Sequence, residues 1–65
     1  MRILVNGVWR ETESHDLAAT LAELGYGGRI VTTAVNGEFV AADTRPRTAL
    51  TEGDRIEVLA PMQGG

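Results

Sequence analysis

The sequence contains neither cysteine nor lysine, and each absence excludes a class of chemistry. A chain without cysteine cannot form disulfides, thiolate metal sites or a cysteine nucleophile, so covalent cross-links do not offset its small size. A chain without lysine cannot extend conventional lysine-linked chains on itself. The sequence also shows no metal-ligand cluster, phosphate-cradling loop or nucleophile–base set. We therefore expect no metal site, no bound cofactor and no self-contained enzyme.

Long apolar stretches are absent as well. No run approaches the ~20 apolar residues that a membrane-spanning helix requires. Residues 1–6 enter a strand-like pattern at once, which leaves no room for a secretory signal peptide. We expect a cytoplasmic protein that does not associate with a membrane.

Charge is modest and dispersed. The net charge is −3, and all six basic residues are arginines scattered along the chain. They form no basic stripe of the kind that tracks phosphates, so nucleic acid is not an expected partner. The 65 residues make one domain. A domain of this size buries only roughly 60% of the surface of its unfolded chain, so little structure remains for a deep catalytic cavity.

Two Asn-Gly dipeptides predict two β-hairpins. Residues 1–5 are apolar and β-branched and indicate a strand, which Asn6-Gly7 separates from a returning strand over 8–12. A type I′ turn needs a positive φ at both central positions, and Asn-Gly meets that need. Asn36-Gly37 repeats the signal between predicted strands over 30–35 and 38–40.

The segment between the hairpins predicts an amphipathic helix over residues 14–25. Three leucines recur at i, i+4 and i+7 and share one face: Leu17, Leu21 and Leu24. Gly25 can take the left-handed conformation that ends helices.

The start of this helix contains polar residues. We predict that Ser14 caps the first turn through its hydroxyl and that Asp16 lies near the positive end of the helix dipole. His15 is the single histidine. We expect it in the first turn as a solvated residue, because no Cys or Ser partner arrangement supports a catalytic role.

The remaining segments complete a β-β-α-β-β-β order. We predict an irregular connection over 41–48, a turn over 51–54 and a last strand over 55–60 in which Ile56 and Val58 share one face. One helix covering one sheet gives an α+β two-layer domain. Pro61 ends the last strand, so we assign residues 1–60 to the domain and residues 61–65 to a flexible tail that reaches roughly 17 Å when extended.

Three local patterns coincide with a terminal diglycine, Gly64-Gly65. They are Ile3-Leu4-Val5-Asn6-Gly7, Ala34-Val35-Asn36-Gly37-Glu38-Phe39-Val40, and Leu50-Thr51-Glu52-Gly53-Asp54-Arg55-Ile56-Glu57-Val58. With these patterns, the chain resembles the sulfur carriers of thiazole biosynthesis, ThiS, in the ubiquitin-like β-grasp superfamily. The resemblance covers essentially the whole chain. It implies a mixed sheet of four to five strands packed on one main helix.

The resemblance implies a cycle in which this chain is a protein cosubstrate. An E1-like adenylating enzyme of the ThiF type would use ATP and Mg²⁺ to activate the Gly65 carboxylate as an acyl-adenylate. Sulfur from a persulfide donor would displace AMP and leave a thiocarboxylate. A thiazole synthase of the ThiG type would then draw that sulfur into the thiazole ring of thiamine. Met62, Gln63 and Gly64 would enter the partner's active site ahead of Gly65.

The residue types suit that chemistry. A terminal carboxylate has a pKa of roughly 3.5, so it is ionised at neutral pH and can attack an α-phosphate. Two glycines remove side chains next to the reacting carbon, so the backbone can thread a narrow channel. The resemblance also makes the first and last strands neighbours, which would put Leu4 and Leu59 on the sheet face that lacks a helix. Two interpretations stay open: isolated exposed apolar residues, or a docking patch for the partner enzymes.

Other large side chains have plainer interpretations. Trp9 shares the ambiguity of Leu4 and Leu59. Tyr26 and Phe39 are predicted to pack in the core or under loops on burial statistics. Arg45 and Arg47 flank Pro46 in the predicted connection, and we expect both to be solvated.

Three alternative functions stay open. A sulfur carrier for molybdopterin synthesis shares the fold and the diglycine, although such carriers are usually longer and approach the diglycine differently from Ala60-Pro61-Met62-Gln63. A ubiquitin-like modifier would join Gly65 to target lysines and produce heavier covalent species in lysates. A plain β-grasp interaction module would keep its binding after removal of Gly64-Gly65.

Overall fold

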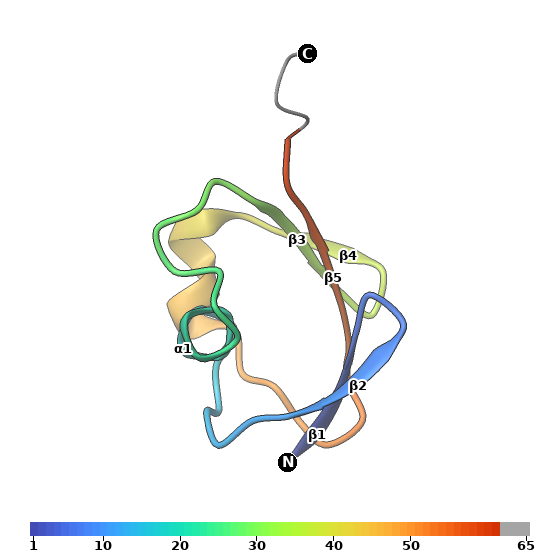
Figure 1. Cartoon of the computed structure of the whole chain (residues 1–65). Coiled ribbons are helices and arrows are strands. Elements are labelled where there is room, and N and C mark those ends of the chain that lie inside the picture. Colours follow the sequence, from blue (N-terminus) through green and yellow to red (C-terminus); the bar gives the residue numbers. More distant parts are fainter. Residues whose placement is uncertain (62–65) are drawn as a thin grey trace.

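The computed structural model describes residues 1–61 (Figure 1). Its elements in chain order are β1 (Arg2–Val5), β2 (Val8–Glu11), α1 (Leu17–Glu23), β3 (Thr32–Val35), β4 (Glu38–Val40), the 3₁₀ helix η1 (Ala42–Arg47) and β5 (Arg55–Leu59). The strands form one sheet in the order β2-β1-β5-β3-β4. β1 and β5 are parallel and the other neighbours are antiparallel, so the sheet is mixed. This confirms the predicted β-grasp architecture.

Both hairpin turns have the predicted backbone. Asn6 and Gly7 have φ values of 49° and 82°, and Asn36 and Gly37 have φ values of 50° and 86°. The strands on either side pair directly across each turn, Val5 with Val8 and Val35 with Glu38. The positive φ values at both central positions match the type I′ turn that Asn-Gly favours.

The core lies between the sheet and α1. Ile56 and Val58 are buried while the alternate residues of β5 are exposed, as the period of two predicts. The helix contributes Leu17 and Leu21, and Leu24 packs against the same cluster. Among residues 1–61 the buried apolar side chains are Ile3, Val5, Leu17, Leu21, Val31, Leu50, Ile56 and Val58. Tyr26 packs against this core, as expected.

The helix starts later than predicted. Asp16, not Ser14, is the N-cap, and its carboxylate accepts a hydrogen bond from the Ala19 N–H at 2.8 Å. The Ser14 hydroxyl instead donates to Glu23 at 2.8 Å. A β-bridge between Asp16 and Ala49 keeps the preceding residues extended. His15 is exposed and precedes the helix rather than lying in its first turn, although its predicted solvation is confirmed.

Residues 41–48 are more ordered than predicted. Most of this connection is η1, in which the Thr44 N–H donates to the Ala41 carbonyl at 3.0 Å. Arg45 is half-buried and donates to the Thr33 hydroxyl at 3.0 Å and to the Val31 carbonyl at 2.6 Å. The prediction that Arg45 is solvated is therefore wrong, because a buried hydroxyl and a backbone carbonyl lie within reach. Within residues 1–61 no helix is long and apolar enough to cross a membrane.

Candidate functional site

The end of β5, which we call the β5 exit, positions Ala60 and Pro61, the last residues that the structure describes. β5 lies in the middle of the sheet, with β1 on one side and β3 on the other. Figure 1 shows it running towards the end of the molecule opposite the N-terminus. The predicted reactive residue Gly65 and the predicted entry residues Met62, Gln63 and Gly64 lie outside the described residues. The structure describes the two residues that precede them, Ala60 and Pro61.

Asn6 holds the second half of β5. Its side-chain oxygen accepts a hydrogen bond from the Val58 N–H at 2.8 Å, and its side-chain amide donates to the Val58 carbonyl at 3.0 Å. Its backbone N–H donates to the Ile56 carbonyl at 2.9 Å. One side chain thus extends the β1–β5 pairing by the equivalent of one residue, three positions before Pro61.

Asn36 holds the start of β5 in a similar way. Its side-chain oxygen accepts from the Arg55 N–H at 2.9 Å, and its amide donates to the Asp54 carboxylate at 3.0 Å. Asp54 also accepts from the Thr51 N–H at 2.8 Å. The Thr51 N–H contributes most to lowering the pKa of Asp54 below its ordinary value of 3.8, with further lowering by the Asn36 and Thr51 side chains, while desolvation opposes. Both hairpin turns therefore anchor the central strand.

The sheet face away from α1 carries exposed apolar side chains on its β5–β3–β4 side. Glu57 pairs with Ala34 and Ala34 with Phe39, so these three residues share the outer face. Phe39 is 69% exposed and Leu59 is 68% exposed. Both line one shallow depression with Ala34 and Glu57. The prediction that Phe39 packs inside is wrong, because its pairing with Ala34 turns it to the uncovered face.

Leu4 lies in a separate part of that face. The first and last strands are neighbours, as the resemblance implied, and Leu4 is half-buried. It is in register with Arg55 and with Trp9, whereas Leu59 lies four residues further along β5. The Arg2 guanidinium lies 4.4 Å from the centre of the Trp9 ring. Leu4 and Leu59 therefore belong to two apolar areas, and Arg55 and Glu57 lie on β5 between them.

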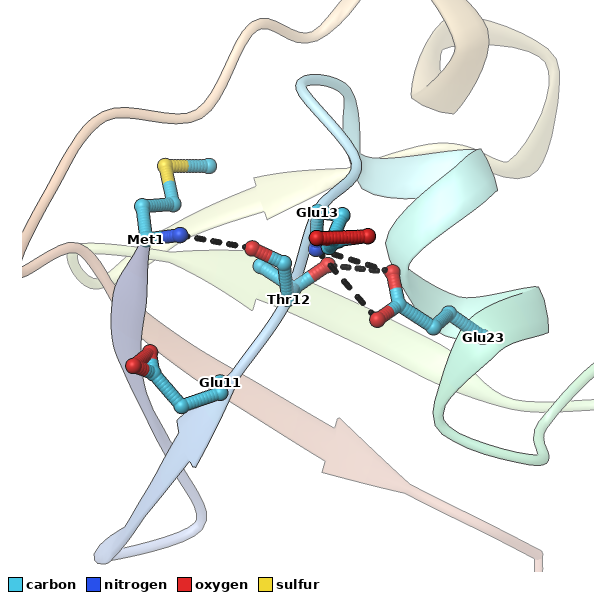
Figure 2. A pocket seen from close by; sticks show the side chains of 5 residues that line it. All are labelled: Met1, Glu11, Thr12, Glu13 and Glu23. Carbon is cyan, nitrogen blue, oxygen red and sulfur yellow. Dashed lines mark hydrogen bonds between the residues drawn. The ribbon is translucent and has the colours of Figure 1, made fainter.

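A hollow at the other end of the molecule is polar. Figure 2 shows Met1, Glu11, Thr12, Glu13 and Glu23 around it. The Glu23 carboxylate accepts hydrogen bonds from the Thr12 hydroxyl at 2.6 Å and from the Glu13 N–H at 3.2 Å. The Thr12 hydroxyl contributes most to lowering the pKa of Glu23, followed by the Ser14 hydroxyl.

The contacts in this hollow serve the fold. They tie the last turn of α1 to the chain that leaves β2, and the Met1 amino group donates to the Thr12 carbonyl at 2.6 Å. Across residues 1–61 no group of three or more His, Cys, Asp or Glu side chains is placed to hold a metal ion. This leaves the β5 exit and the outer sheet face as the candidate site.

Sequence reasoning missed two features of this site. The Asn-Gly signal predicted the turn backbone but not the side-chain hydrogen bonds to β5, because those partners lie up to 52 residues away. Ile30 was expected inside a strand, yet β3 begins at Thr32 and Ile30 is 83% exposed. No local pattern distinguishes Ile30 from the β-branched strand residues that follow it.

Comparison with known proteins matches the whole chain to one family. The ThiS family profile matches residues 3–65. The crystal structure of a thiamine biosynthesis protein (ThiS) from Geobacter metallireducens superposes with a TM-score of 0.83 at 28% identity, covering all of both chains. An NMR solution structure of a thiamine biosynthesis protein from the same organism gives a TM-score of 0.78 at 28% identity, covering all of this chain and 88% of the other.

A curated relative adds a link to a larger protein. A thiazole synthase of Paramagnetospirillum magneticum is 33% identical over 66 residues, and the match covers all of this chain but only 20% of that protein. The chain therefore spans about a fifth of the length of this relative. The family match, the fold and the superposition agree, and the chain belongs to the ThiS family of thiamine biosynthesis, a sulfur carrier family whose members are generally not catalytic.

Proposed function

We propose that this chain is the sulfur carrier for thiazole formation and that its working group is the carboxylate of Gly65. The observation that supports this most directly is the extent of the family match, which runs to residue 65 and so includes the diglycine. The fold supports it as well, because β5 is anchored on both sides and brings the chain to Pro61 at one end of the domain.

The chemistry activates the carbonyl carbon once, as an acyl-adenylate, and then replaces AMP by sulfur. The ionised carboxylate attacks the α-phosphorus of ATP, and pyrophosphate leaves with formation of an acyl-adenylate. The terminal sulfur of a persulfide donor then attacks the acyl carbon, AMP leaves, and an acyl disulfide forms. A second thiol attacks the donor sulfur of that disulfide, which oxidises the two thiols to a disulfide and releases the thiocarboxylate. ATP, Mg²⁺ and the catalytic groups belong to the partner enzymes.

The partner classes follow from this cycle. An adenylating enzyme of the ThiF type and a persulfide donor charge the carrier, and a thiazole synthase of the ThiG type consumes the sulfur. The similarity to a fifth of a thiazole synthase supports the last of these. Leu59, with Phe39 beside it, is our proposed docking area nearest the tail, and Leu4 belongs to a second area.

The alternatives receive less support. A molybdopterin carrier would share the diglycine, but the matching family and both solved structures belong to thiamine biosynthesis. A modifier role and an inert interaction module have no comparable observation in their favour.

Intact-mass spectrometry tests the proposal. The chain ending at Gly65 is incubated with ATP, Mg²⁺, a ThiF-type enzyme and a persulfide donor. We expect the C-terminal diglycine fragment to exchange one oxygen for sulfur. Fragmentation is essential, because oxidation of Met1 or Met62 adds nearly the same nominal mass. An unchanged fragment, with an enzyme that charges a known carrier, would overturn the carrier function.

The variant Gly64→Ala is the matched test of the diglycine. A methyl group next to the reacting residue obstructs a narrow channel and restricts the backbone. We expect charging to fall by at least roughly tenfold, the loss typical of misplacing a reacting group, with an unchanged thermal midpoint. Equal charging of the variant and the parent chain would show that the partner does not require glycine at residue 64.

A further inference from the structure

Ile30 lies level with the residue where the chain leaves the domain. In the antiparallel β3–β5 register Thr32 pairs with Leu59. The ladder ends at this pair; continued by two residues on each strand, the same register would place Ile30 opposite Pro61. Consistently, Arg29, Ile30, Ala60 and Pro61 line one hollow.

Ile30 is held in its exposed position. The Arg29 N–H closes a turn on the Tyr26 carbonyl at 3.1 Å, one residue before Ile30. On the other side, the Arg45 guanidinium binds the Val31 carbonyl at 2.6 Å, and the Val31 side chain is buried. With both neighbours anchored, Ile30 is nevertheless 83% exposed. Most of the Ile30 side chain is therefore accessible to a partner.

Arg29 adds a charge beside this apolar side chain. It is exposed, and its guanidinium carbon lies 6.0 Å from the centre of the Tyr26 ring. A cation–π contact with the ring uses none of the five guanidinium N–H donors, so they stay available to a partner. The natural complement of Arg29 and Ile30 is therefore an apolar surface that carries a carboxylate.

The length of chain beyond Pro61 limits how far from the hollow the occupant can lie. Four residues separate Pro61 from the end of the sequence, and four extended residues reach roughly 14 Å. An enzyme that receives Gly65 in its active site must therefore bring its entrance to within about that distance of the hollow. Its surface around the entrance then meets the side chains that surround the exit of β5.

We propose that Arg29 and Ile30, the exit pair, contact the rim of the adenylating enzyme's tail channel, with Ile30 against an apolar surface and Arg29 against a carboxylate. This inference rests on the proposed carrier function. It adds a recognition element at the β3 side of the exit, whose hollow shares no lining residue with the depression around Phe39 and Leu59. The exit pair binds the partner and takes no part in the chemistry.

Steady-state kinetics of adenylation, measured by ATP–pyrophosphate exchange, test the exit pair. The variants are Ile30→Ser and Arg29→Glu. The matched controls are Val8→Ser and Arg10→Glu, which likewise remove an exposed apolar side chain and reverse an exposed positive charge. Both lie on the edge strand β2, which β1 separates from β5. We expect KM for the carrier to rise by about fivefold or more in each exit variant, with kcat within about twofold of the parent chain. The controls keep the parent KM. Circular dichroism melts show that each variant is folded.

Salt separates the two contacts. We expect the KM of the parent chain to rise with ionic strength and that of Arg29→Glu to fall or stay level, because the attraction has become a repulsion. Unchanged KM values in both exit variants, with an active parent chain, would overturn the exit pair alone. Equal KM increases in the β2 controls would overturn it too, since the effect would then be global. A parent chain that forms no adenylate with a proven enzyme would overturn the carrier function itself, and the exit pair with it.

Discussion

Thr20 and Thr33 are both fully buried, and they differ in what their hydroxyls contact. The Thr33 hydroxyl donates to the Val40 carbonyl at 2.8 Å and accepts from Arg45 at 3.0 Å. The Thr20 hydroxyl has no hydrogen-bond partner among the residues that the structure describes. A buried polar group without a partner costs free energy, so two identical residue types have opposite effects on stability.

We expect Thr20→Val to stabilise the protein and Thr33→Val to destabilise it, each by about 1 kcal/mol. Valine has nearly the same shape and a similar helix propensity, so the first change removes only an unpaired hydroxyl. The second change leaves a carbonyl and a guanidinium N–H without their partner. Urea unfolding at pH 7 measures both. A loss of stability in Thr20→Val as large as that in Thr33→Val would contradict this account of Thr20.

At the scale of elements, two hairpins hold one strand. Asn6 and Asn36 each combine a left-handed turn backbone with side-chain hydrogen bonds to β5. β5 thereby gains partners at both of its ends in addition to its pairing with β1 and β3. The residue type suits both tasks, because asparagine tolerates positive φ and its side chain carries a donor and an acceptor.

The variant Asn6→Gly separates these two tasks. Glycine keeps the positive φ without strain, so in the folded state the change removes the side-chain hydrogen bonds to Val58, while it also raises the entropy of the unfolded chain. We expect a loss of roughly 1–2 kcal/mol in unfolding free energy, and faster hydrogen exchange at the Val58 amide. Asn6→Ala should lose roughly 1 kcal/mol more from backbone strain. Parent-like exchange at Val58 in Asn6→Gly would show that the side chain does not hold β5.

At the scale of the whole molecule, two carboxylates join separate segments of the chain through hydrogen bonds. Glu23 joins the end of α1 to the segment after β2, and Asp54 holds the turn that leads into β5. Hydrogen bonds to the ionised form lower both pKa values from ordinary values of 4.5 and 3.8. In the folded state each group therefore releases its proton at a lower pH than in the unfolded state.

Acid should therefore weaken the fold. As pH falls below about 4.5, the unfolded chain binds more protons than the folded chain does, because the folded pKa values of Glu23 and Asp54 are lower. The stabilisation by these two carboxylates is therefore complete above that pH and is lost on further acidification. We expect Glu23→Gln and Asp54→Asn to be less stable than the parent at pH 7 and to lose less on going to pH 3. Glu11→Gln is the control, because Glu11 lines the same hollow but points away from Glu23 in Figure 2. Urea midpoints at pH 7, 5, 4 and 3 measure this, and parallel curves for all variants would contradict it.

Local signals predicted most of the fold. Asn-Gly at two places, leucines at helical spacing and the alternation around Ile56 and Val58 are encoded by neighbouring residues, and the structure confirms each. One exception was the helix start: both Ser14 and Asp16 are good capping residues, and only the bridge to Ala49 and the contact with Glu23 distinguish them. Arg45 likewise looked solvated until its acceptors on β3 and its neighbour Val31 were in place.

The sequence by itself determined the strands, the α-helix, their order, the family resemblance and the diglycine at residues 64 and 65, because these depend on residue types and short spacings. Only the tertiary structure decided which face of the sheet stays uncovered. It separated Leu4 from Leu59, brought Phe39 beside Leu59 and set Ile30 level with Pro61. For Leu4, Phe39 and Leu59 strand register makes these assignments, and register is a long-range property: a shift of one residue would turn each of these three side chains to the opposite face.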